Sequence, residues 1–247
     1  QETVFTKSRL HLNLTADAEG LDRLAKAAAG LTHALPLGSQ PRASGAMTPR
    51  PEHIGSVIPA QVCYVTKVLT APAYRDPLSA PLFVLARQLS NGYLYRHIRV
   101  QGGAYGGSCR YEPLGGLFAF LSYRDPHLTK TLAVYKEAVQ AAMEKPMTQE
   151  EMEKAVIGAI GSLDRPLDPA GKGYTALIRE LSNLTDDDRR LFRNDVLSVT
   201  PQRLQEAARL YFTRAWEAAV VSVCAPEERL QKANELLPDK LTLEKLP

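Results

Sequence analysis

The sequence predicts an α+β fold, in which an antiparallel or mixed sheet of about five to six strands carries helices packed on one face. Two strand-like segments, residues 104–111 and 115–123, follow each other directly and are joined by E-P-L-G, which is typical of a hairpin. A run of helical patterns comes next, and a further strand-like segment lies only at residues 218–224. Consecutive strands followed by consecutive helices favour this class over alternating β-α units.

The strands are predicted from alternation and from apolar runs. Leu10, Leu12 and Leu14 alternate with polar residues, which is typical of a half-buried strand. Residues 115–123 are mostly apolar on both faces, so this segment is expected to be a central strand. The expected strands cover residues 4–15, 57–70, 104–111, 115–123 and 218–224.

The helices are predicted from apolar residues at three- and four-residue steps and from their start signals. Asp125 is expected to cap a helix with Pro126 at its first position, and Thr148 with Glu151 forms a capping box. Gly92 lies inside a long helix, where a break or a close contact is expected. Helices are expected over residues 17–35, 78–99 and 174–184, and from residues 125, 148, 185, 200 and 226 onward.

The composition is that of an ordinary soluble globular protein, expected to form a single domain over residues 1–247. The net charge of +3 is too small to indicate a nucleic-acid partner, and no apolar run is long enough to indicate a membrane span. Residues 36–56 are dense in Pro, Gly and Ser and are expected to be a mobile loop. The chain begins with Gln, so a processed chain or a piece of a longer one is expected.

The cysteines and histidines do not indicate a metal site. Cys63, Cys109 and Cys224 are far apart and form no C-x-x-C pair, which favours buried thiols in a reducing soluble compartment such as the bacterial cytoplasm or an organelle matrix. The histidines have no zinc-binding spacing. No metal or other cofactor is therefore expected to bind to this chain.

The most informative stretch is R-V-Q-G-G-A-Y-G-G-S-C-R, residues 99–110. Gly102 and Gly103 are expected to turn the backbone between a helix that ends at Arg99 and a strand that begins near Tyr105. The two polar side chains would then point into one shared space. A guanidinium and a phenol both donate hydrogen bonds, so this space would suit a ligand with carbonyl oxygens.

An ordinary structural explanation of the same stretch is favoured by these residues alone. Arg99 can be a solvated charge or a cation at the C-terminal end of a helix, where the dipole stabilises it. Tyr105 can be a strand aromatic, and the glycines can form only a tight turn. The stretch lacks both glycine-rich nucleotide-binding patterns, so a nucleotide site is not expected.

Several motifs in the same order resemble those of a known family. They are I-R-V-Q-G-G-A-Y-G at residues 98–106, the S-Y-R-D-P that ends the second hairpin strand, and V-L-S-V-T-P-Q-R-L-Q-E-A-A at residues 196–208. The chain resembles the pitrilysin and insulin-degrading family of zinc metallopeptidases, the inverzincins. I-P-A-Q-V-C-Y-V-T-K, residues 58–67, is similar to the presequence-protease branch.

The resemblance implies the role of this chain. Such enzymes consist of two homologous halves around a chamber, and the first half carries zinc on H-x-x-E-H. This chain lacks H-x-x-E-H and has an Arg and a Tyr six residues apart, so it matches the non-catalytic second half, and within that half it resembles the last of the four domains. The expected partners are a catalytic half, in the same polypeptide or in a partner subunit, and peptide substrates.

The resemblance also implies roles for individual residues. Arg99 and Tyr105 would hydrogen-bond the substrate backbone or the oxyanion across the chamber, and Gly102 and Gly103 would leave room for the substrate. The implied enzyme is a zinc metalloendopeptidase that degrades short unfolded peptides, with no activity expected for this chain alone. The alternative is a structural or peptide-binding homologue, as in core subunits of respiratory complexes, and the intact Arg/Tyr pair argues against it.

Overall fold

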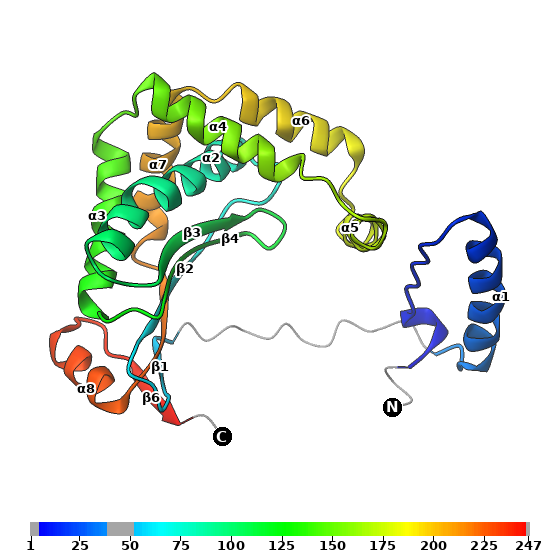
Figure 1. Ribbon diagram of the computed structural model, residues 1–247, viewed down its shortest axis with the longest axis horizontal. Coiled ribbons are helices and arrows are strands. Elements are labelled where there is room, and N and C mark those ends of the chain that lie inside the picture. The colour runs from blue at the N-terminus through cyan, green and yellow to red at the C-terminus, as the bar shows by residue number, and fades with distance from the viewer. Residues whose placement is uncertain (1–4, 39–51, 246–247) are drawn as a thin grey trace. The chain divides into compact units, whose positions relative to one another are not determined.

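The computed structural model describes residues 5–38 and 52–245, which divide into two compact units (Figure 1). Unit 1 consists of the described residues within Gln1–Arg50 together with Arg165–Thr185. Unit 2 consists of the described residues within Pro51–Asp164 and Asp186–Pro247. The expectation that residues 1–247 form one domain stays a prediction.

Unit 2 is built on a six-stranded mixed sheet in the order β3-β4-β2-β5-β1-β6. Neighbouring strands are antiparallel from β3 through β5, whereas β1 runs parallel to both β5 and β6. The mixed sheet confirms the predicted fold class. The strands are β1 (Ile54–Val57), β2 (Tyr64–Thr70), β3 (Gly106–Glu112), β4 (Leu117–Tyr123), β5 (Val220–Ala225) and β6 (Thr242–Lys245).

Helices cover one face of this sheet, as predicted. Figure 1 shows α2, α3, α4 and α7 together on one side of the strands. Side chains of alternate strand residues point toward them, and Val65, Leu69, Phe118 and Phe120 are almost completely buried there. The helices of unit 2 are α2 (Ser79–Leu89), the π-helix η2 (Ser90–Val100), α3 (Thr129–Glu144), α4 (Gln149–Leu163), α6 (Asp186–Leu197), α7 (Pro201–Ala215) and α8 (Glu227–Leu236).

Unit 1 contains two amphipathic helices, α1 (Ala18–Ala34) and α5 (Pro169–Leu181). Asp17 caps α1 by accepting a hydrogen bond from the Gly20 N–H at 2.7 Å, and Asp168 caps α5 in the same way through Gly171 at 2.6 Å. None of the helices in the described ranges of either unit has the length and apolar character needed to cross a bilayer.

Two predictions about strands were wrong, and one strand was missed. Residues 5–15 contain a short 3₁₀ helix, η1 (Lys7–Arg9), and no strand, because alternation needs a neighbouring strand to pair with and unit 1 has none in its described part. The single strand expected over residues 57–70 is two strands, β1 and β2, with Pro59 between them. The short strand β6 was not predicted.

The predicted mobile loop, residues 36–56, is partly contradicted. Residues 54–56 belong to β1, which pairs with β5 and β6. Residues 39–51 lie outside the described residues. The pairing of β1 with two strands from the C-terminal part of the chain could not be read from the local composition.

Of the two predicted helix caps, one is confirmed and the other is wrong. The capping box of Thr148 and Glu151 is present, so this prediction is confirmed. Asp125 does not cap α3, which begins only at Thr129. Its buried carboxylate instead accepts hydrogen bonds from the His127 N–H at 2.9 Å and the Thr131 hydroxyl at 2.8 Å, and so fixes the connection between β4 and α3.

The π-helix η2 continues directly from α2. The Ser90 hydroxyl lies at its start, 2.8 Å from the carbonyl oxygens of both Ala86 and Cys109, so it ties the widened helix to β3. The change of helix type falls just before Gly92, where the sequence predicts a break. π-Helical segments are rare and occur frequently at functional sites.

A glycine turn ends η2. Gly103 has a φ of +75°, and its N–H donates to the Arg99 carbonyl at 3.1 Å, which is a left-handed helix stop. A Cβ added to Gly102 would lie 2.5 Å from the Ile98 carbonyl oxygen. The chain therefore reverses within a few residues and enters β3.

Replacing Gly102 by Ala is expected to destabilise the protein by about 1–3 kcal/mol, because the new methyl group would overlap a backbone oxygen that cannot move independently. Gly161→Ala is the matched control: nothing lies near its Cβ position at the end of α4, so this variant is expected to be about as stable as the wild type or more stable by up to about 1 kcal/mol. Urea denaturation measures both. A Gly102→Ala variant as stable as Gly161→Ala would contradict the account of the turn.

Candidate functional site

Arg99 and Tyr105 lie on either side of the glycine turn and face each other. Arg99 is exposed in the last turn of η2, and Tyr105 lies just before β3 with 65% of its surface exposed. The Cζ atom of Arg99 is 5.8 Å from the centroid of the Tyr105 ring. The structure thus brings both predicted side chains to one patch of surface, with the predicted turn residues Gly102 and Gly103 between them.

Three further tyrosines extend this patch, and the sequence did not single them out. The centroid of the Tyr95 ring lies 5.6 Å from the Arg99 Cζ atom. The Tyr123 ring meets Tyr105 edge to face at 5.8 Å, and the Tyr64 ring meets Tyr123 in the same way at 5.3 Å. We call Tyr64, Tyr95, Arg99, Tyr105 and Tyr123 the tyrosine patch.

A local signal existed for only part of the tyrosine patch. Tyr95 precedes Arg99 by one helical turn, a spacing at which side chains on a helix become neighbours. Tyr64 and Tyr123 meet only because β2 pairs with β4, and this register joins segments that are far apart in the sequence. Cross-strand pairs of this kind cannot be found without knowing the strand order.

The tyrosine patch continues onto the sheet face that the helices leave open. Tyr64 alternates with the buried Val65, and Tyr123 projects from the same face as the exposed Leu117. Figure 1 shows the helices of unit 2 on the other side of these strands. An extended segment of polypeptide could therefore lie along this face and reach Arg99 and Tyr105.

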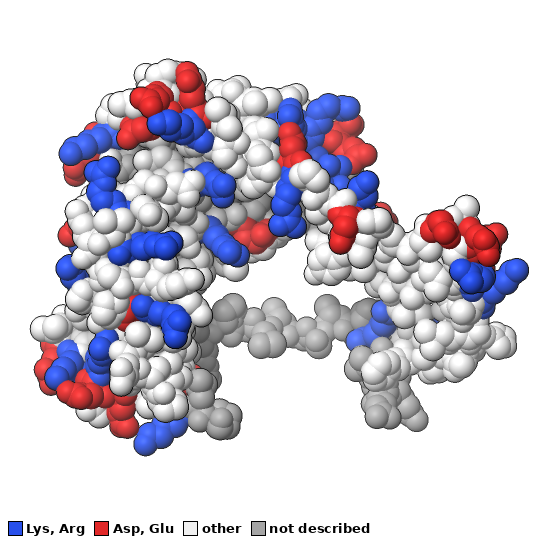
Figure 2. All heavy atoms as spheres, viewed as in Figure 1, with Lys and Arg blue, Asp and Glu red and all other residues white. Residues whose placement is uncertain are grey.

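The charge of Arg99 is not neutralised within the described residues. No carboxylate in residues 5–38 or 52–245 forms an ion pair with it, whereas other arginines such as Arg193 and Arg189 do. Figure 2 shows positive and negative side chains interspersed on the face in view, without a large field of one sign. Because Arg99 forms no ion pair among the described residues, its guanidinium is free to donate to a ligand.

No group of His, Cys, Asp or Glu side chains in the described residues is arranged to hold a metal ion. The expectation that this chain binds no cofactor stays a prediction. The three cysteines are free; Cys63 and Cys109 are buried, and burial raises the pKa of the Cys109 thiol to about 12. This thiol is therefore protonated at neutral pH and unreactive.

The sequence of this chain is similar to that of a known protein family. The family model described as the PreP C-terminal domain matches residues 54–225. The presequence protease 1 of Arabidopsis thaliana, chloroplastic/mitochondrial, is 34% identical over 238 residues, which is 95% of this chain and 22% of that protein. The mitochondrial presequence protease of Danio rerio is 32% identical over 170 residues, covering 69% of this chain and 16% of that protein. The chain thus spans less than a quarter of the length of these relatives.

Solved structures share the fold at low sequence identity. The crystal structure of pitrilysin matches 92% of this chain and 25% of its own with a TM-score of 0.61 and 14% identity. The peptidase M16 inactive domain from Pseudomonas fluorescens matches 83% of this chain and 51% of its own with a TM-score of 0.60 and 18% identity. These structures share the fold of the chain. The family model over residues 54–225 and the presequence protease relatives show that the chain belongs to the presequence protease family, where it matches the C-terminal domain.

Proposed function

We propose that this chain is the substrate-binding, non-catalytic domain of a zinc metalloendopeptidase that degrades short unfolded peptides. The observation that carries the proposal is the placement of the Arg99 guanidinium 5.8 Å from the Tyr105 ring at an exposed surface, without a carboxylate partner among the described residues. Membership of a peptidase family supports it. The two groups would donate hydrogen bonds to the carbonyl oxygens of a bound peptide.

The chemistry of peptide hydrolysis explains why such donors are useful. When water attacks the scissile carbonyl, negative charge develops on the carbonyl oxygen. A phenol O–H and a guanidinium N–H that are already in place stabilise this charge without reorganising. The zinc, and the glutamate that acts as base, would come from a catalytic half carrying H-x-x-E-H, in the same polypeptide or in a partner subunit.

The open sheet face suggests how the peptide would lie. An extended peptide carries side chains on alternate faces, and the rings of Tyr64 and Tyr123 offer apolar contact area next to Arg99 and Tyr105. Since the donors and the zinc would lie on opposite walls, closure of the two halves would complete the site. The pair would then contribute mainly to the transition state.

The proposed location is a reducing compartment, either an organelle matrix or the bacterial cytoplasm. The three free cysteines support it, since persistent disulfides are rare in such compartments. The relatives named above are described as mitochondrial or chloroplastic.

A second candidate is a structural or peptide-binding homologue without a catalytic partner. The shared fold is compatible with it, because a fold does not by itself determine a function. The two candidates differ in one readily obtained observation. An open reading frame that encodes H-x-x-E-H upstream of Gln1 supports the peptidase, and one that lacks it, with no partner subunit that carries the motif, supports the homologue.

In the complete enzyme, Tyr105→Phe is expected to lower kcat for peptide cleavage by about 10²–10³-fold, because it removes one donor to the developing oxyanion. Arg99→Ala is expected to lower kcat/KM at least as much, because the charge is lost with the hydrogen bonds. Tyr93→Phe and Arg214→Ala are matched controls outside the tyrosine patch and should cleave at the wild-type rate. Wild-type cleavage by both Tyr105→Phe and Arg99→Ala would refute these roles.

The isolated chain is expected to purify without stoichiometric zinc and to leave peptides intact, because the groups that bind zinc are assigned to the other half. Metal analysis of the purified chain by mass spectrometry tests this. One tightly held zinc ion per chain would contradict the assignment to a non-catalytic half.

A further inference from the structure

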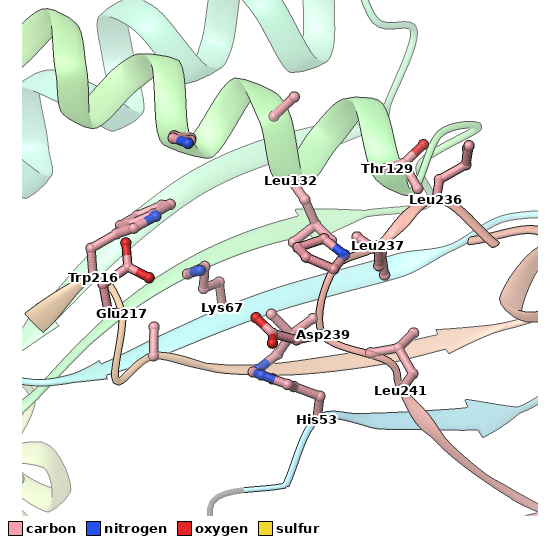
Figure 3. A pocket seen from close by; sticks show the side chains of 15 residues that line it. His53, Lys67, Thr129, Leu132, Trp216, Glu217, Leu236, Leu237, Asp239 and Leu241 are labelled. Carbon is pink, nitrogen blue, oxygen red and sulfur yellow. The ribbon is translucent and has the colours of Figure 1, made fainter. Parts of the chain in front are cut away.

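A second candidate site lies on the opposite, helix-covered side of the sheet in unit 2. It is a cavity of about 390 Å³ between α3, the connection that follows α8, and strands β2 and β5 (Figure 3). Volumes of this size are typical of small-molecule sites. Its wall combines apolar and polar surface, and the apolar part includes Leu132, Leu237 and Leu241. Charged side chains interrupt this wall at a few points.

Lys67 is the central charged group of the cavity. It lies on β2 between the buried residues Val65 and Leu69, at a position of the pleat that faces the helices. Its ammonium group is 4.1 Å from the centroid of the Trp216 ring, a cation–π contact. Among the described residues it forms no ion pair, and burial lowers the pKa of Lys67.

His53 presents a second donor to the same space. Its Nδ1 atom accepts a hydrogen bond from the Val221 N–H at 3.0 Å. A neutral imidazole with an acceptor at Nδ1 carries its proton on Nε2, so Nε2 is a donor. Within the described part of the chain this atom forms no hydrogen bond. Lys67 and His53 thus offer two donors whose hydrogen-bonding capacity is unused.

The charges around the cavity balance. Glu217 and Asp239 contribute two carboxylates, and Lys67 and Lys136 contribute two ammonium groups. Figure 3 shows Trp216 and Glu217 on one side of Lys67 and Asp239 on the other, with Leu132 and Leu237 beyond. A ligand of one sign would meet like charges here, and an uncharged apolar ligand would leave the donors desolvated and unpaired.

We propose that this cavity binds a small zwitterion with an apolar side chain, of the chemical class of free amino acids and dipeptides. Its carboxylate would accept hydrogen bonds from Lys67 and from His53 Nε2, and its ammonium group would lie by the carboxylates of Glu217 and Asp239. Its apolar side chain would contact the leucines of the wall. The inference does not rest on the proposed function, because Tyr64 and Tyr123 project from the other face of the sheet.

The single tryptophan of the chain makes the test direct. Trp216 lines the cavity, so a ligand bound there changes the surroundings of the fluorescent ring directly. Titration of the 247-residue chain with L-leucyl-L-leucine is expected to give a saturable change in fluorescence. N-acetyl-leucyl-leucine and leucyl-leucinamide, which each lack one charge, are expected to bind at least about tenfold more weakly.

Variants then locate the site. Lys67→Met and Glu217→Gln are each expected to weaken dipeptide binding at least about tenfold, measured by calorimetry because these changes also alter the surroundings of Trp216. Lys172→Met, which removes an exposed lysine of α5 in unit 1, is the matched control and should bind as the wild type does.

Three results would each overturn the proposal. It is overturned if the wild-type chain shows no saturable binding of the dipeptide, or if the two blocked analogues bind as tightly as the dipeptide. It is also overturned if a folded Lys67→Met variant, checked by circular dichroism, retains full affinity. If Lys67→Met does not fold, the comparison of the blocked analogues with the wild-type chain decides.

Discussion

The turn at Gly102 and Gly103 is the constraint on which the site depends. Arg99 lies in the last turn of the π-helix η2, and the left-handed conformation of Gly103 ends this helix just after it. The chain enters β3 within a few residues, so Tyr105 comes back beside Arg99. A longer connection would separate the two side chains. Because a Cβ at Gly102 would overlap the Ile98 carbonyl oxygen, only glycine fits this reversal without strain.

Because of the pleat of the sheet, neighbouring residues of a strand point to opposite faces and so have different roles. Along β2, Val65 and Leu69 point into the core, and Tyr64 points to the open face that carries the tyrosine patch. Lys67 also points toward the helices, but it lies where their cover leaves a cavity. One strand therefore contributes to the core, to the proposed peptide surface and to the proposed zwitterion site. A shift of one residue in its register would exchange these roles.

Part of the fold and of the candidate site could be predicted from short sequence patterns. The helix end, the paired glycines and the strand start are adjacent in the chain, so the meeting of Arg99 and Tyr105 could be foreseen, as could the capping box at Thr148. The contacts of Tyr64 with Tyr123 and of Lys67 with Trp216 depend on strand order and helix placement, which no local pattern encodes. The strand expected over residues 4–15 failed for a related reason: alternation indicates a possible strand, but a strand forms only where a neighbour pairs with it.

The central claim is that Arg99 and Tyr105 act as one unit on a bound peptide. A double-mutant cycle on kcat/KM of the complete enzyme, with Arg99→Ala, Tyr105→Phe and the combined variant, tests it most directly. If both groups hold the same carbonyl region, the combined loss is expected to be clearly smaller than the product of the two single losses, with a coupling energy of about 0.5–3 kcal/mol. Strictly multiplicative losses would show that the two side chains act independently, and would contradict the account.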